Sequence, residues 1–299
     1  MKPWESPSNA VLEVDLAAIQ ANFRTMRRLV DPAATVAAVV KSDAYGLGLL
    51  PVAEELHDAR CDFFFVANFD EASRLRCVLP DASIAVLQDE VADFGQIYRS
   101  ERLIPVANNE RDVHAIGRHP LTRRYFLNVD TGFSRFGLTF AEARRLYFAE
   151  TFRSKPPYGV MSHLACSDLA GDALNTLQRK RFSAVSDLLR PMIRTLSASA
   201  GVWLGRSYHS HMVRVGSALY GLNNAGVQPN PLVPVVHLST KIVDVRGVSR
   251  NEAVGYGATY RTAREIRLGI AAIGYTQGLP WLCANKDQRE ARGLGDLAR

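Results

Sequence analysis

VAAVVKSDAYGLG, residues Val36 to Gly48, joins an apolar run to a polar turn that contains two glycines. The five apolar residues before Lys41 predict a fully buried strand, and a lysine is unusual at the end of such a strand. If this is the first strand of a β/α barrel, Lys41 lies at the carboxyl end, where such barrels carry their chemistry. A partly buried lysine there can form a Schiff base with a carbonyl cofactor. A lysine that merely closes a strand fits this stretch equally well.

Length and composition indicate a globular protein with one large domain or two, because 47% of the 299 residues are hydrophobic. The net charge of +6 is scattered, so we expect no nucleic-acid partner. No apolar run reaches the roughly 18 residues that span a bilayer, and the N-terminus has no apolar signal region. We therefore expect a cytoplasmic protein without a membrane partner. The cysteines lack metal-ligand spacing, which predicts reduced thiols and no metal site; they are Cys61, Cys77, Cys166 and Cys283.

Extended and helical patterns alternate along the first two thirds of the chain at the spacing of repeated βα units. Such apolar strands between amphipathic helices predict a closed, parallel (β/α)8 barrel of the TIM type. A doubly wound open sheet is the alternative. The predicted strands are Val36–Lys41, Phe63–Ala67, Ile84–Leu87, Ile104–Val106, Tyr125–Val129, Gly159–Leu164, Arg194–Ser197 and Val213–Val215.

A change of pattern follows Gly221. Turn residues and three prolines form a linker, after which short strands replace the helical period. We place a barrel domain at residues 1–228 and a smaller β domain at 229–299, with strands near Val235–Leu238, Lys241–Val245 and Ile266–Ile273.

The segment MVRVGSALYG, Met212 to Gly221, places Gly216 and Ser217 at the end of the last predicted barrel strand. Backbone N–H groups after strands seven and eight are the usual phosphate site of such barrels. Ser199, in the loop after the preceding strand, and Tyr45 can add hydroxyl groups. Arg214, two residues before the turn, is expected to point into the barrel mouth.

The motifs VVKSDAYGLG, VDTGFSRFG, MSHLACSD, MVRVGSALYG and VGYGATYRT occur in the order found in the alanine racemase family, which this chain resembles over about residues 10 to 282. The resemblance implies a barrel that binds pyridoxal 5'-phosphate as an aldimine of Lys41, followed by a β domain. It also implies that the chain racemises L- and D-alanine, supplying D-alanine for cell-wall peptidoglycan, and that it works as a homodimer.

Residue by residue, the resemblance assigns Lys41 and Tyr256 as the two catalytic bases, one on each face of the substrate. It assigns Arg214 to the pyridine nitrogen of the cofactor, His163 to a position beneath the cofactor, and Arg135 to the substrate carboxylate. Ser199, Gly216, Ser217 and Tyr45 match the phosphate-binding positions. Free tyrosine titrates near pH 10, so we expect cationic neighbours such as the His163–Arg214 pair to lower the pKa of Tyr256.

Three features depart from the family pattern. Ala198 stands where the family commonly has asparagine, so we expect weakened but not abolished cofactor binding. Gln277 stands where the family usually has aspartate, so a hydrogen-bond acceptor there has lost its charge. The chain also ends before the family's last strands, and we expect a truncated β domain with impaired activity. The final segment, residues 285–299, matches nothing in the family and is expected to be frayed or weakly helical.

Three alternatives remain open at this stage. The chain could be a catalytically weak or inactive homologue that only binds pyridoxal phosphate, or a racemase of another amino acid. A barrel decarboxylase of basic amino acids is the third, and it is disfavoured because that chemistry requires an acidic partner at the place of Arg214.

Overall fold

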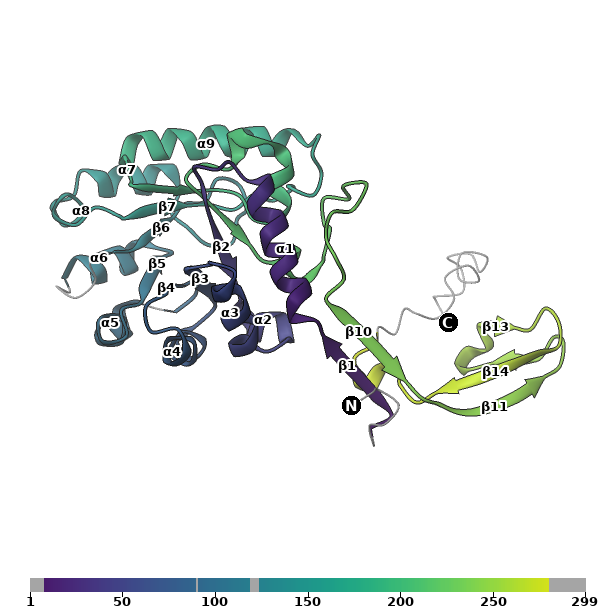
Figure 1. Ribbon diagram of the computed structural model, residues 1–299. Coiled ribbons are helices and arrows are strands. Elements are labelled where there is room, and N and C mark those ends of the chain that lie inside the picture. Colours follow the sequence, from purple (N-terminus) through teal and green to yellow (C-terminus); the bar gives the residue numbers. More distant parts are fainter. Residues whose placement is uncertain (1–7, 90, 119–123, 280–299) are drawn as a thin grey trace. The chain divides into compact units, whose positions relative to one another are not determined.

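Eight parallel strands form the centre of the larger of two compact units, Asp15–Val235. The computed structural model describes residues 8–89, 91–118 and 124–279 (Figure 1). Each strand pairs with its neighbour in sequence, and the last pairs with the first in the order β8-β7-β6-β5-β4-β3-β2-β9. The strands are β2 (Thr35–Val39), β3 (Phe63–Val66), β4 (Ser83–Val86), β5 (Ile104–Ala107), β6 (Phe126–Asn128), β7 (Gly159–Met161), β8 (Ile193–Thr195) and β9 (Met212–Val215).

The sheet closes where β8 meets β9. His211 N donates to Arg194 O and Arg214 N donates to Ser197 O, each at 3.0 Å. Ala198 and Arg214 also form an isolated parallel bridge. The predicted (β/α)8 barrel is therefore confirmed, and the doubly wound open sheet is wrong, because an open sheet would leave β8 and β9 as unpaired edges.

Helices surround the barrel (Figure 1). The first begins at Leu16, and the carboxylate of its N-cap residue, Asp15, accepts a hydrogen bond from Ala18 N at 2.9 Å. The helices of this unit are α1 (Leu16–Leu29), α2 (Lys41–Gly46), α3 (Leu49–Asp58), α4 (Phe69–Val78), α5 (Val91–Ser100), α6 (Glu110–Arg118), α7 (Phe140–Tyr147), α8 (Glu150–Ser154) and α9 (Ala173–Leu189), with the 3-10 turns η2 (Ala200–Leu204), η3 (Arg206–Tyr208) and η4 (Ser217–Tyr220).

Aromatic side chains fill the interior of the barrel. The ring centroids of Phe63, Phe65 and Phe126 lie 5.3 to 6.0 Å apart, and aliphatic residues such as Ala85 and Val106 pack around them. Gly159 faces this group, because a Cβ built there would lie 2.3 Å from Phe126 Cε1. The interior is thus a packed core, and the chemistry is confined to the end of the barrel.

The turn after β2 is left-handed. The strand ends at Val39, two residues earlier than predicted, and Ser42, Asp43, Ala44 and Tyr45 all have φ between 54° and 60°. Left-handed backbone costs an L-residue roughly 1–2 kcal/mol, so four in succession need support from the rest of the fold. Lys41 therefore begins a strained turn and does not close the strand.

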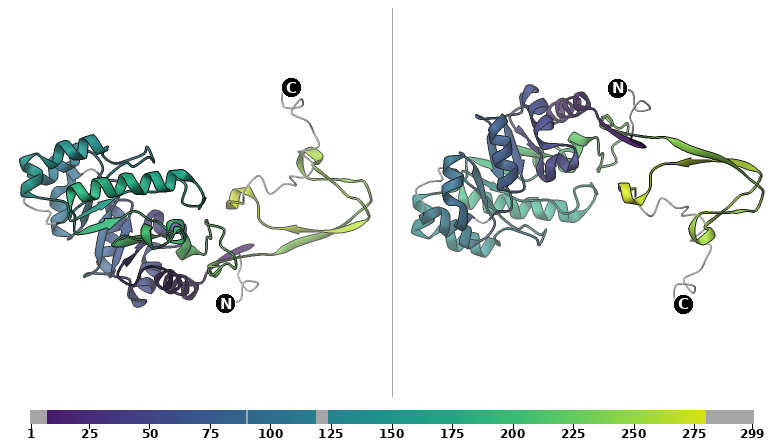
Figure 2. Two further views of the ribbon diagram at one scale, coloured as in Figure 1. Left: turned by 90° about the horizontal axis from the view of Figure 1, so that it is seen from above. Right: turned by 90° about the horizontal axis from the view of Figure 1, so that it is seen from below.

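The described part of the second unit comprises residues 8–14 together with 236–279. Within it, β1 (Ala10–Val14) pairs antiparallel with β10 (Val236–Thr240), and β11 (Ile242–Val248) pairs antiparallel with β14 (Ile266–Ala271) to form the long green-to-yellow ribbon in Figure 2. A small hairpin joins β12 (Ala253–Val254) to β13 (Tyr260–Arg261), and the 3-10 turns are η5 (Tyr256–Ala258) and η6 (Tyr275–Gln277). The predicted C-terminal β domain is confirmed.

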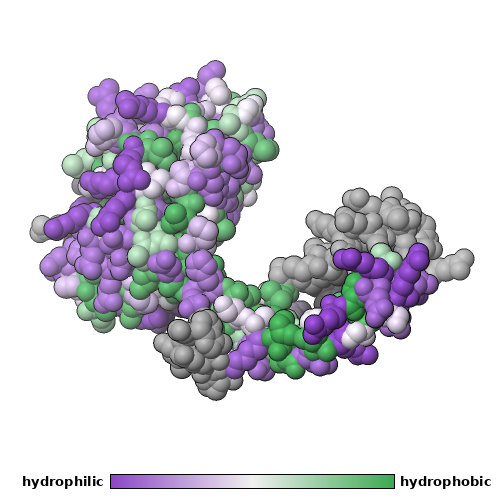
Figure 3. All heavy atoms as spheres, turned by 45° about the vertical axis from the view of Figure 1, so that its right-hand side comes forward, coloured by the Kyte–Doolittle hydropathy of each residue, from purple (hydrophilic) through white to green (hydrophobic). Residues whose placement is uncertain are grey.

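Exposed aliphatic side chains gather on the strands of this second unit (Figure 3). Leu12, Leu238 and Ile242 are among them, with exposed fractions between 48% and 57%. A run of exposed apolar side chains on a small β unit is typical of an interaction surface.

Several sequence-based expectations concern other parts of the chain. Cys61, Cys77 and Cys166 are free thiols, whereas Cys283 and the segment 285–299 lie outside the described residues. Across residues 8–89, 91–118 and 124–279, no helix has the length and apolar character that a bilayer crossing requires. Within the same ranges, no three His, Cys, Asp or Glu side chains are arranged to hold a metal ion.

Candidate active site

A cavity of about 420 Å³ lies at the carboxyl ends of the barrel strands. It is lined by residues from the ends of all eight strands or from the loops that follow them. Enzymes with β/α barrels have their active sites at this end of the barrel. Eight of the nine site residues predicted from the sequence line this one cavity: Lys41, Tyr45, Arg135, His163, Ser199, Arg214, Gly216 and Ser217.

Lys41 is half-buried at the edge of the cavity, where the left-handed turn begins. The backbone on its N-terminal side is tied to the neighbouring strand, because Val40 N donates to Phe65 O at 2.9 Å. On its C-terminal side, Ala44 N donates to Val40 O at 2.9 Å and closes the turn. The base of the Lys41 side chain is thus fixed by main-chain hydrogen bonds on both sides.

Four residues form a small polar group on one wall of the cavity. Ser199 Oγ accepts hydrogen bonds from the backbone N–H groups of Gly216 (3.0 Å) and Ala218 (3.2 Å), so its own proton is free to point elsewhere. The Tyr45 hydroxyl lies against Gly216, since a Cβ at that glycine would come within 2.6 Å of Tyr45 Oη. Partial burial raises the pKa of Tyr45, which keeps the hydroxyl protonated as a donor. Ser217 follows directly at the start of η4.

Arg214 lies on β9, and its side chain is buried with only 4% of the residue exposed. Its guanidinium donates to Thr195 Oγ1 (2.7 Å), Thr195 O (2.9 Å) and Ser162 O (2.6 Å). Burial lowers the pKa of Arg214 to about 10, so the group stays charged at neutral pH. These partners are all neutral, which leaves a buried positive charge facing the cavity.

His163 follows β7, which ends at Met161 and not at Leu164 as predicted. Burial, together with the charges of Arg214, Arg135 and Lys41, lowers the pKa of His163 to about 3. Arg214 Nη2 lies 3.4 Å from His163 Nδ1, and because arginine only donates, this ring nitrogen accepts. The expectation of a cationic His163–Arg214 pair is therefore wrong for the histidine, since the charge belongs to Arg214 alone.

Arg135 lies in the loop after β6, with its guanidinium carbon 4.4 Å from the centroid of the Phe133 ring. Asp130 organises this loop: its Oδ1 accepts from the backbone N–H groups of Gly132 (2.8 Å), Phe133 (2.9 Å) and Ser134 (3.1 Å). Burial raises the pKa of Asp130, but these hydrogen bonds outweigh burial and lower it overall. The loop thus presents Arg135 on a preorganised frame.

Tyr256 is the ninth predicted residue, and it belongs to the second unit. It begins η5 directly after Gly255, whose φ is 75°, and 91% of the tyrosine is exposed. Its hydroxyl is therefore accessible at the surface of its own unit.

Two asparagines of the cavity wall were not predicted from the sequence. Asn128 Nδ2 donates to Asn108 Oδ1 at 2.8 Å, and Asn108 Nδ2 donates to Leu87 O at 2.8 Å, which links the ends of three neighbouring strands. Both line the cavity. The signal was present, because each follows or ends an apolar strand, where a polar residue in a parallel barrel faces the site.

Comparisons with known proteins agree with this geometry. The sequence families described as "Alanine racemase, N-terminal domain" and "Alanine racemase, C-terminal domain" match residues 14–224 and 235–294. The chain is 59% identical to "Alanine racemase 3" of Mesorhizobium japonicum over 94% of its own length and 72% of the relative's. It is 58% identical to "Alanine racemase, biosynthetic" of the same organism over 93% and 70% of the two lengths.

Solved structures that resemble this fold are also alanine racemases. The fold is similar to that of alanine racemase from Bartonella henselae with covalently bound pyridoxal phosphate, with a TM-score of 0.84 and 32% identity over 92% of this chain and 78% of that one. It is also similar to the biosynthetic alanine racemase from Pseudomonas aeruginosa, with a TM-score of 0.82 and 31% identity over 91% and 77% of the two chains.

Proposed function

Because the chain belongs to the alanine racemase family, we propose that it is a pyridoxal phosphate-dependent enzyme that interconverts L- and D-alanine. The observation that carries the proposal is the convergence of Lys41, Arg214 and the Ser199–Gly216 group on one cavity at the carboxyl end of the barrel. When bound, pyridoxal phosphate makes the Cα proton of an attached amino acid acidic. The residues of this chain have to hold the cofactor, orient the substrate and move that proton.

The polar group on the cavity wall fits the cofactor's phosphate. Ser199 and Tyr45 supply hydroxyl donors, and the absence of a Cβ at Gly216 leaves room for the Tyr45 hydroxyl beside that backbone. Ser217 adds a further hydroxyl beside them. We assign these four residues to the phosphate and Lys41 to the covalent link with the cofactor.

Arg214 is assigned to the pyridine nitrogen of the cofactor. Its guanidinium is anchored by Thr195 and Ser162 and cannot donate a full proton near neutral pH, so the ring nitrogen accepts a hydrogen bond and stays unprotonated. A ring in that state withdraws electrons less strongly, which restrains side reactions. The neutral His163 supports this arrangement by accepting from Arg214.

Substrate orientation and proton transfer fall to three residues. Arg135, held by the Asp130 loop, is assigned to the substrate carboxylate, a natural partner for a planar guanidinium. Lys41 and Tyr256 are assigned as the two bases, because racemisation removes a proton from one face of Cα and returns one to the other.

Tyr256 completes the site most simply in a homodimer, where it would act at the partner's cavity. Its full exposure and the exposed aliphatic side chains of its unit support this arrangement. A cytoplasmic enzyme that supplies D-alanine for the cell wall is the role we propose, in keeping with the biosynthetic name of one relative.

Reductive trapping tests the central assignment. Borohydride treatment of the chain loaded with pyridoxal phosphate, followed by peptide mapping, should place the pyridoxyl group on Lys41. Lys41→Ala should abolish both labelling and racemisation, whereas Lys180→Ala, a lysine-to-alanine change at an exposed helix position, should leave both intact. Labelling of a different lysine would remove Lys41 from its role.

Exchange assays with L- and D-alanine and with several other amino acids test the substrate. Alanine should be racemised in both directions at the highest kcat/KM. A higher kcat/KM for another amino acid would contradict the choice of alanine while leaving the reaction type in place.

A further inference from the structure

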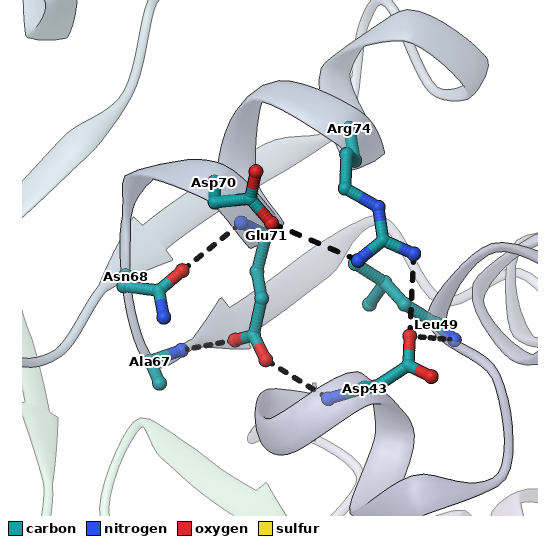
Figure 4. A network of polar contacts seen from close by, with 7 residues as sticks. All are labelled: Asp43, Leu49, Ala67, Asn68, Asp70, Glu71 and Arg74. Atoms are coloured by element: carbon teal, nitrogen blue, oxygen red, sulfur yellow. Dashed lines mark hydrogen bonds and ion pairs between the residues drawn. The ribbon is translucent and has the colours of Figure 1, made fainter.

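The left-handed turn after Lys41 is hydrogen-bonded to a buried carboxylate from a different βα unit. Glu71, in the first turn of α4, is 7% exposed. One carboxylate oxygen accepts a hydrogen bond from Asp43 N at 2.9 Å, in the middle of the turn. The other accepts from Ala67 N at 2.8 Å, directly after β3 (Figure 4). The Glu71 side chain therefore joins the turn that follows Lys41 to the end of the neighbouring barrel strand.

A second set of contacts holds the same turn from its far side. Asp43 Oδ1 accepts from Leu49 N at 3.0 Å and from Arg74 Nη2 at 3.3 Å, and Arg74 also lies 3.7 Å from Asp70. Figure 4 shows Glu71 and Arg74 reaching from one helix toward the backbone and the side chain of Asp43. The turn is thus held through both the main chain and the side chain of one residue.

The chain contains a natural comparison for Glu71 at α6. There Asn109 accepts from Asp112 N at 2.9 Å, and the buried Asp112 carboxylate accepts from Asn108 N at 2.9 Å. The same local pattern occurs at α4, where Asn68 accepts from Glu71 N at 3.0 Å and Glu71 accepts from Ala67 N. Glu71 also accepts a hydrogen bond from Asp43 N, outside its own helix. Capping a helix therefore accounts for only one of the two hydrogen bonds that Glu71 accepts.

We propose that Glu71 is a positioning residue for Lys41, acting through the left-handed turn that begins there. The inference rests on the proposed function, because it concerns where the cofactor lysine is held. Asp43 is two residues from Lys41 and two from Tyr45, so the hydrogen bond from its N–H to Glu71 acts midway between the lysine and the predicted phosphate ligand. Without that bond, residues that favour right-handed backbone are free to leave the strained conformation.

Glu71→Asp separates the two roles of the side chain. Aspartate can cap α4 as Asp112 caps α6, but it is one methylene too short to reach Asp43 N as well. We expect kcat to fall about 10- to 100-fold with KM for alanine nearly unchanged, since a misplacement of about 1 Å can cost on the order of a hundredfold in rate. Hydrogen exchange of the peptide spanning residues 41–50 should accelerate about tenfold or more, with and without cofactor.

Asp112→Asn is the control, because it perturbs a buried carboxylate with the same local hydrogen bond at the next but one helix. It should accelerate exchange around residues 107–113 and leave the 41–50 peptide at the wild-type rate. If Glu71→Asp changes neither kcat nor exchange of the 41–50 peptide, while borohydride still labels Lys41 in the wild type, the inference is wrong and the proposed function stands. If the wild type is not labelled at Lys41, the proposed function itself fails.

A rescue experiment tests the physical reason. Ser42 is exposed and left-handed, and glycine adopts that conformation without strain. Ser42→Gly added to Glu71→Asp should recover a large part of the lost kcat and slow the exchange of the 41–50 peptide again. No recovery would mean that Glu71 does not act by holding the left-handed turn, which would overturn the inference.

Discussion

His163→Gln should flatten the acid side of the protein's stability profile. The imidazole has a pKa of about 3 in the folded protein, against roughly 6.5 in an unfolded chain. The unfolded state therefore binds a proton first as pH falls, so stability that is present above pH 6.5 is lost between about 6.5 and 3. At pH 5.5 the protonated form of this histidine outnumbers the neutral form by about ten to one in the unfolded chain. Its protonation therefore removes about 1.4 kcal/mol from the free energy of unfolding. A glutamine cannot titrate and avoids this loss.

Urea unfolding of the cofactor-free protein, followed by circular dichroism at pH 7.5 and 5.5 and equal ionic strength, measures the effect. The wild type should lose about 1.4 kcal/mol more than His163→Gln between the two conditions. Each protein's free energy of unfolding at pH 7.5 is its own reference value, because the comparison concerns only the change with pH. Equal losses in the two proteins would show that His163 is not held neutral by burial beside Arg214, Arg135 and Lys41.

Three further changes test other parts of the structure. Asn22→Ala should lower the free energy of unfolding by about 2–4 kcal/mol in urea titrations, because the buried amide pairs with both backbone groups of Val233 and with Leu219 O. Asp130→Ala should raise KM for alanine with little change in borohydride labelling of Lys41, because it releases three amides of the Arg135 loop. Arg214→Glu should divert turnover toward transamination, measured as pyruvate formed from alanine, because a carboxylate would favour a protonated ring nitrogen.

The barrel could be predicted because its strands are continuous apolar runs. Segments such as Phe63–Val66 and Ile104–Ala107 are buried at every position, so the sequence pattern and the burial coincide. The predicted ends of these strands were less accurate than their positions. Lys41 and His163 were assigned to strands that stop two residues before each of them, because nothing in the local composition marks where the backbone leaves the sheet.

The left-handed turn could not be predicted from its own residues. Serine, aspartate, alanine and tyrosine all favour right-handed or extended backbone, and only aspartate tolerates the left-handed region at all well. The group that supports the turn is Glu71, 28 residues further along the chain, and it reads in the sequence as an ordinary acidic residue in a first helical turn. Tertiary contacts therefore override local preference at the position that carries the proposed cofactor lysine.

The charges around the cavity explain why its groups are arranged as they are. Lys41, Arg135 and Arg214 line it, and the one carboxylate among the described lining residues, Asp130, is occupied by three backbone amides. The cavity therefore holds uncompensated positive charge, which adds to the effect of burial in lowering the pKa of His163. Such a site is least stable when empty and best matched by a ligand with several negative charges. A phosphate dianion and a substrate carboxylate would supply that charge, so the electrostatics of the cavity agree with the proposed anionic cofactor and substrate.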